Sequence, residues 1–291
     1  MPDIVISDKK NEVLFDLASQ VSPALTGQSG EGGPELIRAG QDNTLALQRF
    51  YHQLQSLHAS SGKPYWQTRG WGVLTWQPLY LSFLSLYCLG SVPSSLGKLA
   101  QQQKGDMVSG FFLPEGRWYC LKYSGCTVPE LIALACQQIR PVIQQLQWEF
   151  ERISGFSKAK SQRVMADRVL LTLLRLAEAS NELNSFVKQT LTQEEQQHWG
   201  FTAAPWLHQR LNEKERFIAD AILWLKGLEL PVEHYLRLKE KPALLAVSST
   251  EMIEPHGPGL YLKRLTCCMH YRREDGDLCA NCPRLKKNKA A

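Results

Sequence analysis

Lys263 to Pro283 reads K-R-L-T-C-C-M-H-Y-R-R-E-D-G-D-L-C-A-N-C-P, and this is the most informative stretch of the 291-residue chain. Its four cysteines, spaced C-C-x10-C-x2-C, are Cys267, Cys268, Cys279 and Cys282. Four thiolates within one short loop can close around a metal centre. In a C-x2-C pair both sulfurs can face one ion, while backbone amides turn inward, hydrogen-bond the sulfurs and tune a redox potential. The stretch therefore predicts a metal centre near the carboxyl terminus.

The other four cysteines are scattered and are expected to be small buried hydrophobic residues: Cys88, Cys120, Cys126 and Cys136. The amino-terminal sequence M-P-D-I-V-I-S-D-K-K has acidic residues where a signal peptide would be basic. The longest apolar run, Leu79 to Gly90, is shorter than the ~20 residues of a membrane span. We therefore expect a cytoplasmic protein with reduced thiols and at most peripheral membrane contact.

The positive charge of the chain is concentrated around the cysteines. From Lys263 onward there are eight basic and three acidic residues, a difference of +5 that equals the net charge of the whole chain. Residues 1–262 are therefore neutral overall. The basic segment either keeps the protein soluble or attracts an anionic partner, and Lys286, Lys287 and Lys289 are candidate docking residues.

The pattern of the remaining chain predicts an α+β fold that is mostly helical. Helices are expected to pack around a small antiparallel sheet, followed by an irregular C-terminal metal-binding segment. The expected hairpin joins 107–112 and 117–123 through L-P-E-G, and a short strand covers 243–247. One helix is expected to start at Asp42, and a second spans 76–89 with entry at Pro78. A third opens with a Thr127–Glu130 capping box, and a fourth spans 159–189. A short helix follows a second cap at Thr192–Glu195, and the last runs from Pro205 to just before Gly227.

Three regions follow from these patterns. Residues 1–35, glycine-rich from 26 to 35, are expected to be a flexible N-terminal segment. Residues 36–258 form the folded body, and residues 259–291 form the C-terminal segment that carries the four cysteines. A chain of this length can bury roughly three quarters of its unfolded surface, so the body has room for a sizeable core.

The cysteine motif resembles the C-terminal signature of the FhuF family, ferric-siderophore reductases that bind a [2Fe–2S] cluster. That signature has an adjacent cysteine pair, ten residues and a C-x2-C pair followed by proline. R-L-T-C-C-M-H-Y-R at 264–272 and C-A-N-C-P at 279–283 match it, and W-G-V-L-T-W-Q-P-L-Y at 71–80 is similar in placement. Relatives often have Pro-Gly-Gly where this chain has Arg273 to Gly276, which leaves the four cysteines intact but changes local polarity.

The resemblance implies that all four cysteines ligate a [2Fe–2S] cluster and that the body, 36–258, docks the substrate. The implied reaction is one-electron reduction of a ferric siderophore, expected to be a hydroxamate, with release of Fe(II) in the cytoplasm. It implies no catalytic residue beyond the cluster. All-cysteine ligation suits the low potential that a stable ferric complex demands. No dinucleotide-binding glycine fingerprint is present, so the expected electron donor is a reduced ferredoxin-like protein or a thiol.

Two other classes of function fit parts of the pattern. Four cysteines can also build a zinc-stabilised binding module whose basic tail touches nucleic acid, although zinc ribbons normally use two separated C-x2-C pairs. An iron–sulfur sensor or electron carrier without its own substrate is the third possibility. We favour the reductase and expect no nucleic-acid partner.

Several residues near the motif have weaker expectations. Neighbouring side chains diverge in extended backbone, so a tight, non-strand conformation is predicted at Cys267 and Cys268. His270 is expected to be a solvent or supporting residue, and His256 to fill a loop. Candidates for a cleft or an anionic ligand are Trp66, Trp71, Trp76, Arg69, Arg117 and Lys122.

Overall fold

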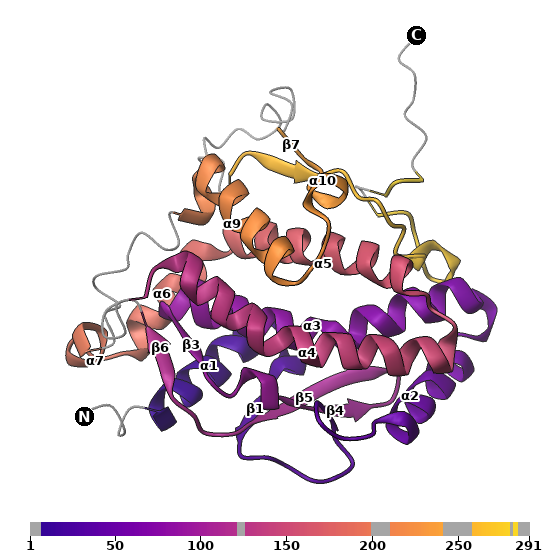
Figure 1. Cartoon of the computed structure of the whole chain (residues 1–291), viewed down its shortest axis with the longest axis horizontal. Helices are drawn as coiled ribbons and strands as arrows, with labels where there is room; N and C mark the ends of the chain where they lie inside the picture. Colours follow the sequence, from indigo (N-terminus) through magenta and orange to yellow (C-terminus); the bar gives the residue numbers. More distant parts are fainter. Residues whose placement is uncertain (1–6, 121–125, 199–209, 241–257, 280–281, 285–291) are drawn as a thin grey trace.

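The computed structural model describes residues 7–120, 126–198, 210–240, 258–279 and 282–284 (Figure 1). The helices are α1 (Ser7–Val21), α2 (Thr44–Leu57), α3 (Lys63–Leu89), α4 (Val128–Ser154), α5 (Lys158–Glu178), α6 (Ser180–Thr190), α7 (Gln193–His198), α9 (Lys214–Gly227) and α10 (Val232–Tyr235). The strands are β1 (Gly27–Ser29), β2 (Ile37–Arg38), β3 (Ser91–Pro93), β4 (Ala100–Lys104), β5 (Met107–Leu113), β6 (Trp118–Cys120), β7 (Leu238–Glu240) and β8 (Leu260–Leu262). The fold is mostly helical α+β, as predicted.

Helix α3 is the centre of the molecule. It packs against α1, α2, α4, α5 and α6, and also touches β3 and β5. Figure 1 shows it between the sheet on one side and α5 on the other. Most of its residues are buried all round, in keeping with a helix whose apolar residues occupy every face.

Helix α3 begins at Lys63, well before the predicted start at 76, and it continues through Pro78. Proline has no N–H, so Pro78 leaves the carbonyl of Leu74 without its helical donor. The side chain of Gln101, on β4, donates to that carbonyl at 3.0 Å. The predicted entry at Pro78 was wrong because a distant side chain satisfies the group that proline leaves unpaired.

The main sheet has the order β1-β5-β4-β2, in which β5 pairs parallel to β1 and antiparallel to β4. The predicted hairpin between 107–112 and 117–123 was wrong. The first of these runs, β5, forms its hairpin with β4, and β6 from the second pairs with β3 in a separate sheet. Residues 121–125 lie outside the described residues. The turn is K-G-D at 104–106, where Gly105 has φ 62°, and the Gln-rich β4 is a poor match to strand patterns.

The expected flexible segment 1–35 is ordered in the structure from Ser7 onward. Helix α1 buries Val13, Leu14 and Leu17 in the core, and β1 pairs with β5. The glycines of 26–35 allow the chain to approach β5 closely: a Cβ on Gly27 would meet the ring of Phe111. Glycine here serves close packing, which composition cannot distinguish from flexibility.

Most other helix predictions hold, with shifted boundaries. Helix α2 buries Leu47, Phe50 and Leu54, while Leu57 is exposed. The Thr127–Glu130 capping box is present on α4, and Thr192 and Glu195 exchange the same pair of bonds ahead of α7.

The two remaining helix predictions need correction. The predicted helix 159–189 is divided at Ala179 into α5 and α6. The predicted helix from Pro205 bends at Glu213, so that α9 starts at Lys214 and ends at Gly227. Its start at Pro205 and the predicted strand 243–247 lie outside the described residues.

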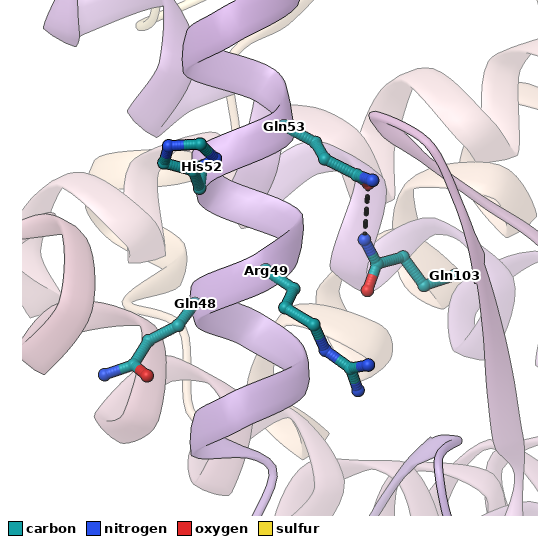
Figure 2. A pocket seen from close by; sticks show the side chains of 5 residues that line it. All are labelled: Gln48, Arg49, His52, Gln53 and Gln103. Atoms are coloured by element: carbon teal, nitrogen blue, oxygen red, sulfur yellow. Dashed lines mark hydrogen bonds between the residues drawn. The ribbon is translucent and has the colours of Figure 1, made fainter.

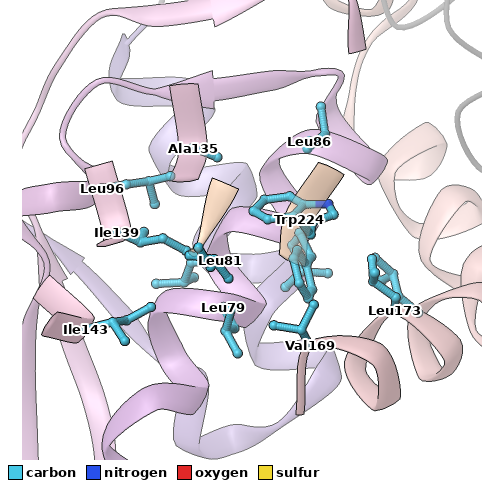
Figure 3. Packing of buried hydrophobic residues seen from close by; sticks show 14 of the residues in the cluster. Leu79, Leu81, Leu86, Leu96, Ala135, Ile139, Ile143, Val169, Leu173 and Trp224 are labelled. Atoms are coloured by element: carbon cyan, nitrogen blue, oxygen red, sulfur yellow. The ribbon is translucent and has the colours of Figure 1, made fainter. Parts of the chain in front are cut away.

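One continuous core joins the helices (Figure 3). Trp224 of α9 is fully buried, and its ring lies among leucines and isoleucines of α3, α4 and α5. Its indole N–H donates to the Tyr87 hydroxyl at 3.0 Å, and that hydroxyl donates to Asp220 at 3.1 Å. This core fixes α5, the helix against which the cysteine segment lies. Among the described residues, no helix has both the length and the apolar character needed to cross a bilayer.

Candidate metal centre

The cysteine segment is attached to the body through β8. This strand pairs antiparallel with β7, and the amide of Lys263 donates to the carbonyl of Arg237 at 2.9 Å. Strand β8 packs on α5, and the chain then continues without regular structure through the first two cysteines. A short 3-10 turn at His270–Arg272 follows.

The four sulfurs of the segment form two pairs. The Cys268 and Cys279 sulfurs are 3.4 Å apart, and the Cys267 and Cys282 sulfurs are 3.9 Å apart. The adjacent cysteines therefore belong to different pairs, as do the two cysteines of the C-x2-C element. No cysteine in the described part of the chain is in a disulfide.

The backbone bends sharply around the adjacent cysteines. Neither Cys267 nor Cys268 is in a strand, and Met269, the next residue, has the left-handed values φ 59° and ψ 13°. The amide of Met269 points to the Cys267 sulfur at 3.4 Å, and the amide of His270 donates to the Cys268 sulfur. The predicted non-strand conformation is confirmed, and the bend brings two amides to two sulfurs.

Asp167 of α5 anchors the segment just before the cysteines, and the sequence patterns did not predict it. Its buried carboxylate accepts bonds from the amide of Thr266 at 2.8 Å, the Thr266 hydroxyl at 2.6 Å and the amide of Leu265 at 3.1 Å. Asp167 could have been recognised from its neighbours on α5, because it lies between Ala166 and Val169, which are both buried. A buried acid needs a hydrogen-bonding or charged partner.

Arg264 contacts one of the four sulfurs and also lies near the anchoring residue Asp167. Its guanidinium donates to the Cys279 sulfur at 3.4 Å and lies 4.0 Å from Asp167. Burial raises the pKa of the Cys267 and Cys279 thiols. Burial acts in the same direction on Cys268, but the His270 amide, the Cys279 thiol and Arg264 outweigh it and lower the pKa of Cys268.

A cavity of about 640 Å³ opens directly beside one of the two sulfur pairs. Cys268 and Cys279 line it, together with residues of α3 and α5. Arg69, a candidate from the sequence for an anionic ligand, lies in its wall, whereas Arg117 and the tryptophan candidates do not. His270 also lines the cavity and is exposed.

A second hollow, of about 470 Å³, lies on α2 and includes none of the cysteines (Figure 2). In it Gln103 donates to the Gln53 side chain at 2.8 Å, beside Gln48, Arg49 and His52. It carries no cluster of groups that suggests chemistry.

The other predicted residues are placed as follows. Cys88, Cys120 and Cys136 are buried and Cys126 is partly buried, close to expectation. Lys122, His256, Lys286, Lys287 and Lys289 lie outside the described residues.

The donor set fits a binuclear iron–sulfur centre. Each iron of an all-cysteine [2Fe–2S] cluster takes two thiolates, and the segment presents two sulfur pairs. In the part of the chain that the structure describes, no three His, Cys, Asp or Glu side chains are arranged to hold a single metal ion.

Comparison with known proteins agrees with a binuclear iron–sulfur centre. Residues 264–284 match the family model of the FhuF 2Fe-2S C-terminal domain. The matched residues include all four cysteines and Arg264. No solved structure matches the chain. The chain therefore carries, at residues 264–284, a FhuF 2Fe-2S C-terminal domain, and its cofactor is a [2Fe–2S] cluster.

Proposed function

We propose that the four cysteines hold the cluster in the pairs that the sulfur distances define. Cys268 and Cys279 then bind one iron, and Cys267 and Cys282 bind the other. The proposal rests on the 3.4 Å and 3.9 Å separations, since two thiolates on one metal lie next to each other. Residues 259–291 act as the cluster-binding segment, and residues 36–258 act as the body that docks the substrate.

The function that this arrangement supports best is one-electron reduction of a ferric siderophore. One electron passes from a reduced ferredoxin-like protein or a thiol, through the [2Fe–2S] centre, to the chelated Fe(III). The donor is oxidised by one electron and the iron becomes Fe(II). A hard oxygen chelate holds Fe(II) far more weakly than Fe(III), so the ferrous ion exchanges out of the siderophore in the cytoplasm.

The observation that carries this proposal is the cavity of about 640 Å³ beside Cys268 and Cys279. Its volume lies within the roughly 300–1,000 Å³ of typical small-molecule sites. A chelate bound there would contact the walls formed by α3 and α5 while lying against two ligand sulfurs. Electron transfer of this kind needs proximity and orientation, and it needs no nucleophile or general base.

The alternatives make different use of the same residues. A zinc-stabilised module does not agree with the match to a 2Fe-2S domain. A sensor or carrier would need no cavity next to its ligands, whereas this chain has one. We keep the hydroxamate as the proposed iron-binding group of the substrate.

Anaerobic mixing tests the function. The protein is isolated with its cluster, reduced by one electron, and mixed with ferric siderophores of several classes in the presence of a coloured Fe(II) chelator. We expect the cluster absorption to recover and the Fe(II) complex to form in equal amounts. Failure of every hydroxamate, carboxylate and catecholate chelate to reoxidise the cluster would leave the sensor or carrier function in its place.

A further inference from the structure

The cavity beside Cys268 and Cys279 is lined by an unusual number of arginines. Three come from the body, Arg69 on α3 and Arg168 and Arg175 on α5, and two come from the cysteine segment, Arg264 and Arg273. Three aspartates also line it: Asp167, Asp275 and Asp277. Five cations against three anions leave the wall with an excess of positive charge, and the excess is not spread evenly.

The two arginines of the cysteine segment already have partners. Arg273 forms two bonds of 2.7 Å with Asp275, one to each carboxylate oxygen. Arg264 donates to the Cys279 sulfur and lies 4.0 Å from Asp167. Asp167 itself is occupied by the Leu265 and Thr266 amides and the Thr266 hydroxyl. These groups hold the segment together and leave little charge for a ligand.

The arginines of the body are different. Arg69 donates to the thioether sulfur of Met107 at 2.7 Å, and its Nε is buried without a partner among the described residues. In the described part of the chain, Arg168 and Arg175 form no hydrogen bond or ion pair. Burial lowers the pKa of Arg168 to about 10. Tyr80 acts in the opposite direction, and the repulsion of Arg69, Arg175 and Arg264 adds to the effect of burial. An anion bound in the cavity would offset the mutual repulsion of these arginines and supply acceptors to the buried Nε groups of Arg69 and Arg168.

The fold also makes room for Arg168. Its guanidinium lies against Gly72 of α3, in the space that a Cβ would occupy. Glycine inside a helix makes the helix less stable than alanine would. Gly72 therefore lowers the stability of α3 but leaves space for the Arg168 guanidinium. Residues 168, 172 and 175 follow helical spacing on α5, which places Arg168 and Arg175 on the same wall.

We infer that this cavity binds a ferric chelate of net negative charge, with carboxylate groups of the chelate facing Arg168, Arg69 and Arg175. The inference rests on the proposed function and names the substrate class of the same site. Guanidinium groups match carboxylates through two parallel hydrogen bonds. Three hydroxamates merely neutralise the ferric ion, so a simple trihydroxamate complex gains little from these arginines. A chelate that combines hydroxamates with citrate-type carboxylates keeps a negative charge and satisfies them.

Binding of redox-inert gallium(III) chelates to the cluster-loaded full chain tests the inference without turnover. The two probes are the gallium complex of a citrate-derived dihydroxamate, which is anionic, and that of a neutral trihydroxamate. We expect the anionic complex to bind at least about tenfold more tightly at low salt, as expected for one or more charge-assisted bonds. Arg168→Gln should weaken it by about tenfold and change the neutral complex less than about twofold.

Two further variants separate a binding role from a structural one. Gly72→Ala displaces the Arg168 guanidinium without removing its charge, and it should weaken the anionic complex in the same direction. Arg117→Gln removes an exposed arginine that does not line the cavity and should change neither complex. Arg168→Gln should keep the cluster, the reduction potential and the melting temperature of the parent, or melt slightly higher, because an unpaired charge is removed.

Equal affinity for the two complexes, or an equal loss for both in Arg168→Gln, would overturn the inference. A shifted reduction potential in Arg168→Gln would make the residue a counterion of the cluster and would also overturn it. The inference would also be overturned if salt and Arg168→Gln changed only the rate at which an acidic donor protein reduces the cluster and left the affinity for the chelates unchanged. The proposed function fails separately, when the reduced protein reduces no ferric chelate even though gallium chelates bind.

Discussion

Asp167 binds Thr266 twice, through the backbone amide at 2.8 Å and through the hydroxyl at 2.6 Å. The two residues are 99 positions apart, and Thr266 immediately precedes Cys267. Asp167 is on α5, whose inner face is in the core. Its carboxylate therefore fixes the backbone just before the adjacent cysteines, Cys267 and Cys268, to the folded body. The cluster-binding segment is thus positioned by a residue outside the FhuF-like match.

Asp167→Asn should release this anchor. All three donors bond Oδ2, and the Leu265 amide also lies 3.2 Å from Oδ1. Asparagine removes the charge that strengthens these bonds and turns an NH2 group toward the Leu265 amide in place of Oδ1, at a cost of about 1–3 kcal/mol. We expect iron and sulfide per chain to fall while the circular dichroism of the helices is kept. Asp277→Asn, a change in the same cavity wall without a bond to Thr266, is the matched control and should retain the cluster. Full iron content in Asp167→Asn would show that the anchor is dispensable.

The paired sulfurs predict how single ligand replacements will group. Serine at position 268 or 279 should perturb the same iron, and serine at position 267 or 282 should perturb the other. Mössbauer spectra of variants that still assemble should therefore fall into these two groups. If instead Cys279→Ser and Cys282→Ser gave one signature and Cys267→Ser and Cys268→Ser gave another, the pairing would be wrong.

Arg264 should raise the reduction potential of the centre. Positive charge and a donated hydrogen bond favour the reduced, more anionic state of a cluster. If the bond to the Cys279 sulfur differs between the two redox states by about 1 kcal/mol, Arg264→Gln lowers the potential by about 40 mV. Redox titration followed by visible absorption measures the shift.

Arg272→Gln provides the control for charge alone. Arg272 is exposed in the same segment, and its guanidinium is near Gly62. The same loss of charge there should move the potential by much less, because solvent screens an exposed cation. Equal shifts in the two variants would mean that overall charge, and not the bond to Cys279, sets the potential.

The gathering of the four cysteines could be predicted from the sequence, because closely spaced cysteines that stay reduced are well suited to ligate a metal centre. Asp167 could not be found in the same way, since its partners are almost a hundred residues away and its own helix has an amphipathic pattern. Arg168 and Arg175 likewise resembled the solvated face of that helix. Only the packing of α3 against α5 places them beside Cys268.

Local patterns predicted capping well and strand pairing poorly. The Thr127–Glu130 box depends on residues three apart and appeared as expected. The hairpin prediction failed because L-P-E-G is a good turn sequence, whereas the true partner of β5 is a glutamine-rich strand. Strand β5 also contacts α3, and such long-range contacts lie outside any local window of sequence.

The bond from Gln101 to the Leu74 carbonyl makes a prediction about stability that is independent of the cluster. Gln101 is buried, and Gln101→Leu would leave the carbonyl opposite Pro78 unpaired, at a cost of about 1–3 kcal/mol. Pro78→Ala restores an N–H to the helix at the same carbonyl, so in that background Gln101→Leu should cost much less. Urea unfolding of the four proteins of this double-mutant cycle measures the coupling. If the losses in the free energy of unfolding were additive, Gln101 would stabilise the protein through its packing in the core, and its hydrogen bond to the Leu74 carbonyl would contribute little.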